Sequence, residues 1–338
     1  MALQHRHHGR ERRLSTRSQI FRCLYLVLKS LLLLEWHIKC EALNLIDSSA
    51  YEFIGAKAEL PLNNIKNLLI GFTEEADATS AALTYGLSLA REAGAHATAL
   101  SASVKLVLTH AVASRMAAGL VAGENQRVKE LAEAAAESAR HQANLEGVPC
   151  TVESVQLQYA ELVGRFTALS RVHDLTVVDA DPEILTMDRT LIEQALFASG
   201  RPVIVVPRSV NTFAAGRIIV AWDGTPKAVR ALNDALPFLR EAEQVDLVSV
   251  SGEKDLTNSV PGAEVAPHLA RHGVNVNVVN LSAQQADVAE TLRNHAALTQ
   301  ADMIVMGAYA HSRLRQLVLG GVTQSLLKAS PVPLFLSY

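Results

Sequence analysis

Residues 301–336 read ADMIVMGAYAHSRLRQLVLGGVTQSLLKASPVPLFL, and this stretch decides the fold. An apolar run stops at Gly307, a mixed loop follows, and the pair Gly320 and Gly321 opens a helix-like segment that leads into a second apolar run. Glycines at both ends of such a loop let backbone N–H groups approach a phosphate without an intervening Cβ. A helix that starts at the glycine pair offers unpaired N–H groups and its positive dipole end to an anion. The segment therefore predicts nucleotide binding.

The composition is that of an ordinary globular protein. The chain has 338 residues, which is long enough for two domains with good cores. Apolar residues make up 49% of it and charged residues 19%. The net charge of −3 gives no overall field that would attract nucleic acid. The three cysteines, Cys23, Cys40 and Cys150, show neither a disulfide framework nor the spacing of a metal site. We therefore expect a cytoplasmic protein in a reducing compartment, with no metal site and no nucleic-acid partner.

The first sixty residues differ from the rest. Arginine and histidine dominate the beginning, and an apolar run at 20–36 is interrupted by Arg22, Lys29 and Glu35. The run is too interrupted for a membrane span and lacks a small-residue cleavage site after it, so we expect no integral membrane segment and no secretory signal. Three interpretations remain open for 1–60: a disordered or partly helical extension, which the composition favours, a basic amphipathic helix on a membrane surface, or a stretch translated from an incorrect start.

From residue 64 onward, apolar strand patterns alternate with helical patterns. Predicted strands lie at 67–72, 96–103, 149–157, 175–178 and 202–206, and predicted helices lie at 76–93, 111–145, 160–172 and 190–199. Alternating strands and helices with short links predict a parallel sheet that is covered by helices on both faces.

The pattern then restarts. A strand at 217–222 precedes Thr225, a good helix N-cap, and Pro226, a good first helical residue. We expect one apolar helix face, made of Val229, Leu232, Leu236 and Leu239. Further strands are predicted at 245–250, 274–278 and 303–306, and the alternation of valine and asparagine at 274–278 is typical of an edge strand.

The two passes align with each other. Residues 174–178 match 302–306, and Pro202 and Val203 match Pro331 and Val332. Two similar units joined near 208–216 are the simplest interpretation. We therefore predict an extension at 1–60, a first domain at 64–208 and a second domain at 216–338. The last strands, 203–206 and 332–336, are able to pair and hold the two units together.

The chain resembles a tandem universal stress protein. The resemblance rests on the sequence VAWDGT at 220–225 and on the glycine loop, where the family has glycine, two residues, glycine, nine residues, and glycine followed by serine or threonine. Gly307 and Gly320 fit this spacing, whereas Ala310 stands at the middle glycine and Gly321 at the hydroxyl residue. A left-handed conformation at Ala310 would cost about 1–2 kcal/mol.

The resemblance implies an α/β fold with two tandem, doubly wound, five-stranded parallel-sheet domains and a role in the stress response. It also implies an ATP or adenine-nucleotide site at the carboxyl edge of the second sheet, and dimer-like packing of the two repeats. Carried over residue by residue, the binding positions are Asp223, Val250, Met306, Gly307, Ala310, Arg313, Gly320, Gly321, Val322 and Thr323.

Each of these residues also has a purely structural interpretation. Asp223 would accept hydrogen bonds from adenine or ribose, or would only shape the turn with Gly224. Thr323 would donate its hydroxyl to phosphate, or would satisfy its own helix terminus. Arg313 would neutralise phosphate charge, or would lie on a solvated loop. Val250 and Met306 would touch the nucleotide, or would simply fill the core.

The first repeat lacks these features. Thr73 stands where the second repeat has Asp223, Asp179 stands where it has Gly307, and Thr190 and Leu191 replace the glycine pair. An aspartate at the phosphate-facing strand end repels anions, and Leu191 adds bulk. We predict that the first repeat binds no nucleotide.

The sequence shows no nucleophile beside a base, no paired carboxylates and no Walker-type lysine, so we expect no enzyme, and at most slow incidental ATP hydrolysis. The alternative function is a nucleotide-independent scaffold for protein interaction or dimerisation, with a homodimer or an unknown protein as the partner. A third interpretation, an enzyme acting on a nucleotide-linked substrate, rests on the fold alone.

Overall fold

The computed structural model describes residues 62, 64–73, 80–108, 115–181, 186–251, 262–283, 287–308 and 321–338, and every structural statement below concerns these residues. Residues 60–338 form one compact unit. The predicted extension lies outside the described residues, and the domain limits 64–208 and 216–338 stay a prediction.

The first repeat alternates strands and helices as the sequence predicts. Its strands are β1 (Asn67–Thr73), β2 (His96–Val104), β3 (Cys150–Leu157), β4 (Leu175–Asp179) and β5 (Val203–Val206). Its helices are α2 (Ala81–Ala93), α3 (Arg115–Glu146), α4 (Tyr159–Val172) and α5 (Met187–Ala198). Ser80 caps α2 by accepting the Leu83 N–H at 3.1 Å, so this helix begins five residues later than we predict from the alanine-rich pattern.

The second repeat follows the same order. Its strands are β6 (Arg217–Ala221), β7 (Gln244–Ser251), β8 (Val276–Ser282), β9 (Met303–Gly307) and β10 (Leu334–Ser337). Its helices are α6 (Pro226–Asp234), α7 (Leu236–Glu241), α8 (Ala266–Arg271), α9 (Val288–Thr299) and α10 (Gly321–Ala329).

The ten strands form one sheet in the order β3-β2-β1-β4-β5-β10-β9-β6-β7-β8. Reading outward from the centre, each repeat has the same order, and within each repeat all neighbouring strands are parallel. This confirms the predicted α/β class with five parallel strands in each repeat. The prediction that 274–278 belongs to an edge strand is also confirmed, because β8 ends the sheet.

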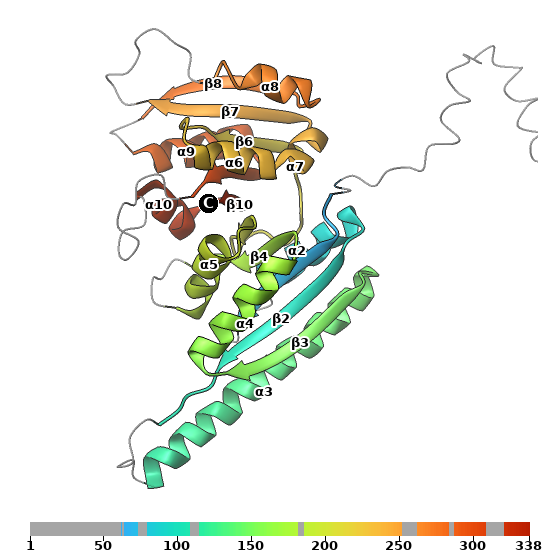
Figure 1. Cartoon of the computed structure of the whole chain (residues 1–338), viewed down its shortest axis with the longest axis vertical. Coiled ribbons are helices and arrows are strands. Elements are labelled where there is room, and N and C mark those ends of the chain that lie inside the picture. Colours follow the sequence, from blue (N-terminus) through green and yellow to red (C-terminus); the bar gives the residue numbers. More distant parts are fainter. Residues whose placement is uncertain are drawn as a thin grey trace, which may run out of the picture. The chain divides into compact units, whose positions relative to one another are not determined.

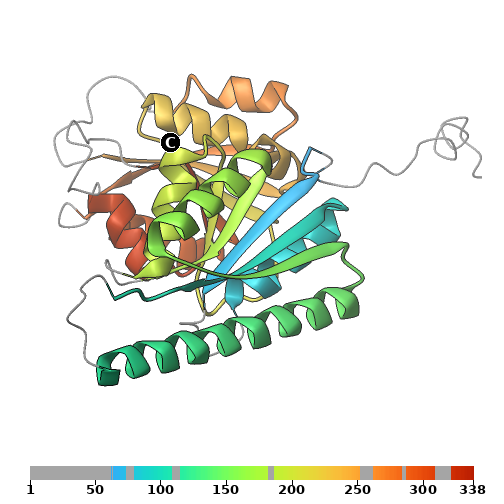
Figure 2. The same cartoon turned by 60° about the horizontal axis from the view of Figure 1, so that its bottom comes forward.

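Helices cover both faces of the sheet (Figure 1). Buried side chains from α2, α3, α6, α7 and α8 pack on one face. Those from α4, α5, α9 and α10 pack on the other. The 32-residue α3 runs along β2 and β3, as Figure 2 shows from a second direction. Two covered faces explain why β1 and β4 read as continuous apolar runs.

The two repeats join where β5 and β10 pair antiparallel, with Ile204 opposite Phe335. Beside this pair, aromatic rings form a chain across the join: Tyr85 contacts Phe213 at 5.7 Å, Phe213 contacts Phe238 at 5.9 Å, and Phe238 contacts Phe335 at 5.6 Å between centroids. These contacts bring first-repeat, linker and second-repeat residues into one core.

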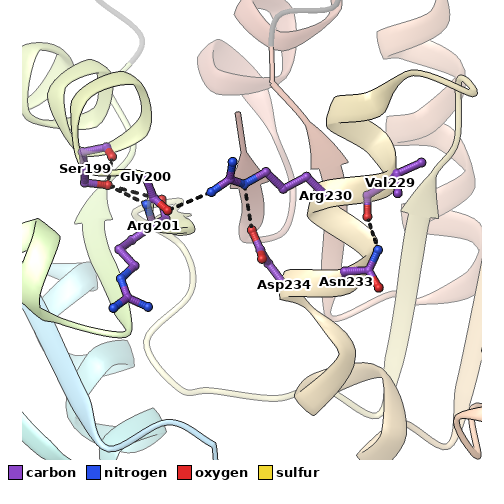
Figure 3. Close-up of polar contacts among 8 residues, drawn as sticks. Ser199, Gly200, Arg201, Val229, Arg230, Asn233 and Asp234 are labelled. Atoms are coloured by element: carbon purple, nitrogen blue, oxygen red, sulfur yellow. Dashed lines mark hydrogen bonds and ion pairs between the residues drawn. The ribbon is translucent and has the colours of Figure 1, made fainter.

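A polar contact reinforces the join (Figure 3). The Arg230 guanidinium of α6 donates to the Gly200 carbonyl, in the turn before β5, at 3.0 Å. The same guanidinium lies 3.7 Å from the Asp234 carboxylate, one helical turn further along. In the turn before β5, which contains Gly200, Ser199 Oγ accepts the Arg201 N–H at 2.9 Å. Arg230 therefore spans the two repeats while Asp234 restrains its side chain.

The predicted apolar helix of the second repeat is corrected in two respects. The segment forms two helices, α6 and α7, which meet at Ala235. Pro237 lies in the first turn of α7, where its missing N–H costs nothing, but it cannot continue the helix that precedes it. Val229 is 44% exposed, so its predicted place on the buried face is wrong.

In the part of the chain that the structure describes, no helix has both the length and the apolar character to cross a membrane. Across the same ranges, no three histidine, cysteine, aspartate or glutamate side chains gather into a group able to hold a metal ion.

Candidate functional site

The carboxyl edge of the second repeat contains a topological switch point. The strand β6 pairs with β9 on one side and with β7 on the other, so successive connections leave β6 and β9 in opposite directions. Ala221 is opposite Met306, which brings Asp223 and Gly307 to the same edge of the sheet. Open α/β sheets bind ligands at such a point.

Asp223 shapes the turn between β6 and α6. Its Oδ1 accepts the Thr225 N–H at 3.0 Å and the Thr225 hydroxyl at 2.7 Å. Gly224 between them has φ +71°, which favours glycine. Thr225 then caps α6 by accepting the Ala228 N–H at 3.3 Å. The predicted structural role of Asp223 is therefore present, and both hydrogen bonds of its exposed carboxylate use Oδ1.

Gly307 has a packing reason to be glycine. A Cβ added to it would lie 2.6 Å from the Ala228 nitrogen, 2.6 Å from the Lys227 carbonyl carbon and 2.9 Å from the Lys227 Cβ. These atoms belong to the first turn of α6, and two of them are backbone atoms. The end of β9 can therefore approach α6 this closely only without a side chain.

The start of α10 is open. Gly321 is exposed, and a Cβ added to it would meet no atom of the described residues within 4 Å. Val322 is half-buried, whereas Thr323 is only 3% exposed and already has an interaction partner. The first four N–H groups of a helix have no partner inside it, so this end is suited to an anion.

The other predicted site residues divide into two groups. Ala310, Arg313 and Gly320 lie outside the described residues. Met306 is 6% exposed and belongs to the core beneath the switch point, and Val250 packs half-buried against the same core.

Sequence reasoning missed three side chains at this edge. The Lys227 ammonium lies 3.9 Å from the centroid of the Tyr338 ring, and the Phe197 ring of α5 meets Tyr338 edge to face at 4.8 Å. Lys227 comes two residues after the predicted N-cap Thr225, and this place in the first turn of a helix at the carboxyl edge was the available signal. The contact with Phe197, 141 positions earlier in the printed sequence, left no sequence signal.

In the first repeat, a carboxylate occupies the equivalent edge. Asp179 Oδ2 accepts the Ser80 hydroxyl at 2.6 Å, and Oδ1 accepts the Ala82 N–H at 2.8 Å. Burial raises the pKa of Asp179, although these hydrogen bonds and the charge of Arg208 act in the opposite direction. The N-terminus of α2 is thus capped by the protein's own anion.

The predicted start of the helix at 190–199 needs a correction. The helix α5 begins at Met187, three residues before the predicted start, because the Thr186 hydroxyl accepts the Arg189 N–H at 3.2 Å. Thr190 and Leu191 therefore lie inside the helix, and Leu191 is only 1% exposed. Neither residue is available to an anion at the helix start.

A cavity of about 470 Å³ lies between the residues that follow β4 and β5 and the end of α10. Its lining includes two acidic side chains, Asp181 and Asp188, which are 7% and 9% exposed, together with Arg208 and Lys328. Each of the two aspartates already has an interaction partner. Buried carboxylates at the carboxyl edge of the first repeat disfavour a phosphate there.

Comparison with known proteins then decides the family of the second repeat. The family described as the Universal stress protein family matches residues 215–337. Residues 215–337 form a universal stress protein domain. No curated protein matches the chain in sequence.

Among solved structures, a universal stress protein from Archaeoglobus fulgidus DSM 4304 is 16% identical, covers 80% of this chain and 95% of its own, and superposes with a TM-score of 0.59. This coverage exceeds the length of the universal stress protein domain, so the likeness in fold extends into the first repeat. A putative universal stress protein from Pseudomonas aeruginosa UCBPP-PA14 is 15% identical, covers 82% and 94%, and has a TM-score of 0.45. A universal stress protein in complex with cAMP is 15% identical, covers 42% and 97%, and has a TM-score of 0.29.

Proposed function

We propose that the second repeat binds ATP or another adenine nucleotide, that the first repeat binds none, and that the protein acts in the cytoplasm as a regulator in the stress response. The observation that supports this most is the open start of α10 beside the switch point, where Gly321 presents no side chain. Regulation by binding requires no strong catalysis, so we propose at most slow hydrolysis of the bound nucleotide.

In this proposal the groups at the edge divide the nucleotide between them. Asp223 keeps Oδ1 in the turn and accepts a ribose or adenine hydrogen through Oδ2. The N–H groups at the start of α10 hold phosphate oxygens. On the sequence alone, Gly320 and Ala310 shape the loop and Arg313 adds positive charge. Because Thr323 is buried, we assign it to the support of α10.

The same reasoning leaves the first repeat empty. Asp179 places a carboxylate at the strand end where the second repeat has Gly307, and a phosphate there would meet both this charge and its hydrogen-bonded partners. We therefore expect one nucleotide per chain.

The substitution Gly321→Leu tests the site without disturbing the described core, because its Cβ meets no atom of the described residues within 4 Å. The exposed Gly119→Leu in α3 is the matched control, since a Cβ there also meets nothing within 4 Å. Isothermal titration should show ATP binding to the wild type and to Gly119→Leu, and at least tenfold weaker binding to Gly321→Leu, a loss of about 1.4 kcal/mol. Equal affinities in all three would contradict the site.

The fluorescence of Trp222, the residue before Asp223, provides an independent readout. The chain has two tryptophans, Trp36 and Trp222, so Trp36→Phe isolates the signal. In this background ATP should change the emission, and Asp223→Asn should weaken binding while it keeps an oxygen for the turn. Asp223→Ala loses both the acceptor for the nucleotide and the acceptor that shapes the turn. The helical content of the two variants must therefore be compared, to separate a loss of binding from a loss of structure. A variant Asp223→Asn that binds ATP as the wild type does would remove Asp223 from the site.

A protein-interaction scaffold is the second candidate function. It is favoured by four large apolar side chains that follow β2 or lie in the first part of α3, which are Leu106, Val107, Leu108 and Leu120, exposed by 47%, 51%, 42% and 71%. Exposed apolar side chains of this size are suited to contact with a second copy of the chain or with another protein. The titration separates the two functions, because a nucleotide-independent scaffold would show no ATP binding even at millimolar ATP.

A further inference from the structure

Lys227 lies against the end of β9. It is half-buried in the first turn of α6, and the position of a Cβ on Gly307 would be only 2.9 Å from the Lys227 Cβ. The glycine at the phosphate-facing strand end and the stem of this lysine are therefore in direct contact. The lysine side chain begins beside the proposed nucleotide and ends in a positively charged ammonium group.

The far end of the same side chain is held near Gly307 as well. The Lys227 ammonium lies over the Tyr338 ring, 3.9 Å from its centroid. The backbone carbonyl of Ser337, next to Tyr338, accepts the Ala308 N–H at 2.8 Å, so the end of β10 is tied to the residue after Gly307. The cation–π contact thus keeps the positive charge at the carboxyl edge between β9 and β10.

The first repeat supports this arrangement. Phe197 of α5 packs edge to face on Tyr338, with centroids 4.8 Å apart and ring planes at 89°. This geometry is favourable for aromatic pairs and restricts the tilt of the Tyr338 ring. An element of the repeat that lacks the glycine loop therefore helps to place the charge beside the site of the other repeat.

We propose that Lys227 is the phosphate counter-ion of the nucleotide site in the second repeat, and that Tyr338, braced by Phe197 of the first repeat, positions it. This inference rests on the proposed function, since it assigns a residue to the same site. The ammonium moves from the ring face to a phosphate oxygen by rotation about its own stem. Its contribution depends on the ligand's charge, so it strengthens the binding of ATP and leaves adenosine, which has no phosphate, unaffected.

The test compares Lys227→Met with Lys328→Met by isothermal titration of ATP and of adenosine into the full chain. Methionine keeps the length of the stem and removes the charge, and Lys328 is an exposed lysine in the last turn of α10. We expect Lys227→Met to weaken ATP binding about tenfold and adenosine binding less than twofold. We expect Lys328→Met to match the wild type for both ligands.

Phe197→Ala tests the contribution of the first repeat. Phe197 is 40% exposed, so its truncation spares the core, and the thermal unfolding midpoint confirms that the variant folds. We expect ATP binding to weaken about threefold with adenosine binding unchanged, and Tyr338→Phe, which keeps the ring, to match the wild type.

The outcomes separate the two proposals. If the wild type binds neither ATP nor adenosine, the proposed function fails. If the wild type binds ATP and Lys227→Met binds it equally well, or loses ATP and adenosine to the same extent, the site stands and the role of Lys227 is refuted. If only Phe197→Ala has no effect, Lys227 remains the counter-ion and the contribution of the first repeat is refuted.

Discussion

Asp179 and Gly307 occupy equivalent places in the two repeats, at the end of the fourth strand of each. Asp179 reaches the first turn of α2 with its carboxylate, whereas Gly307 allows the first turn of α6 to approach the strand itself. The start of α2 therefore meets the carboxylate of the strand end, whereas the start of α6 is capped by its own Thr225 and packs directly on the strand. The difference between a filled edge and an open one follows from this single residue and its neighbours.

The buried carboxyl of Asp179 predicts a pH effect on stability. Because burial raises its pKa, the folded protein holds this proton at a higher pH than the unfolded chain does. The stabilisation from this group is fully present below the ordinary aspartate pKa and is lost as the pH rises through the raised, folded-state value. Asp179→Asn should lack this component, which urea unfolding of both proteins at acidic and neutral pH will measure.

Asp179→Ala is the complementary variant. It leaves the Ala82 N–H buried without an acceptor, so it should lower the free energy of unfolding by about 1–3 kcal/mol. Asn keeps an oxygen for that N–H and should cost less at neutral pH. Identical pH profiles for the wild type and Asp179→Asn would show that the carboxyl is not perturbed.

At this scale the sequence predicted positions better than roles. Asp223 and Gly307 both lie at the predicted edge because alignment of the strands fixes where each strand ends. The capping role of Asp179 was not predictable, since it depends on Ser80 and Ala82, which are about a hundred positions away. Whether the binding positions contact a nucleotide stays a prediction.

At the scale of elements, the closeness of β9 and α6 is the feature that shapes the candidate site. The first turn of α6 has a threonine cap and a proline at its start, and its backbone leaves no room for a side chain on the strand. The turn that carries Asp223 is therefore held from both ends, by the cap and by the contact with Gly307.

Gly307→Ala should separate these two elements. Its Cβ would lie 2.6 Å from backbone atoms of α6, and such overpacking costs about 1–3 kcal/mol. Urea unfolding should show this loss, whereas Gly321→Ala, whose Cβ meets nothing, should stay within about 0.5 kcal/mol of the wild type. Equal stability of Gly307→Ala and the wild type would mean that β9 and α6 are not in contact.

Secondary structure followed from the sequence where apolar periodicity was continuous, as in β1, β2 and β9. It failed where a local contact ended or split a helix. The Ser80 and Thr186 caps and the break at Ala235 each shifted a boundary, because one hydrogen bond or one proline outweighs the periodic pattern nearby.

At the scale of the whole molecule, the two repeats share one sheet and one core. The strand pair β5–β10 and the aromatic chain from Tyr85 to Phe335 connect them. The strand pair was accessible from sequence because both strands are short apolar runs at equivalent places. The aromatic chain was not, because it joins a helix, the linker and a strand.

Tyr85 reports on this shared core. It is fully buried at the join, and among the described residues its hydroxyl has no hydrogen-bond partner. Tyr85→Phe removes this unsatisfied group and keeps the ring that contacts Phe213, so it should raise the free energy of unfolding by about 1 kcal/mol. Chemical denaturation will measure this gain, and a loss of stability would reveal a partner for the hydroxyl.

The central claim is that one repeat binds an adenine nucleotide and the other does not. Isothermal titration of ATP into the full chain tests it most directly through the stoichiometry. We predict one ATP per chain in the wild type. In Gly321→Leu we predict at least tenfold weaker binding, so that the same ATP concentrations fill this site to a smaller extent. Two ATP molecules per chain, or a single one that Gly321→Leu leaves unchanged, would contradict it.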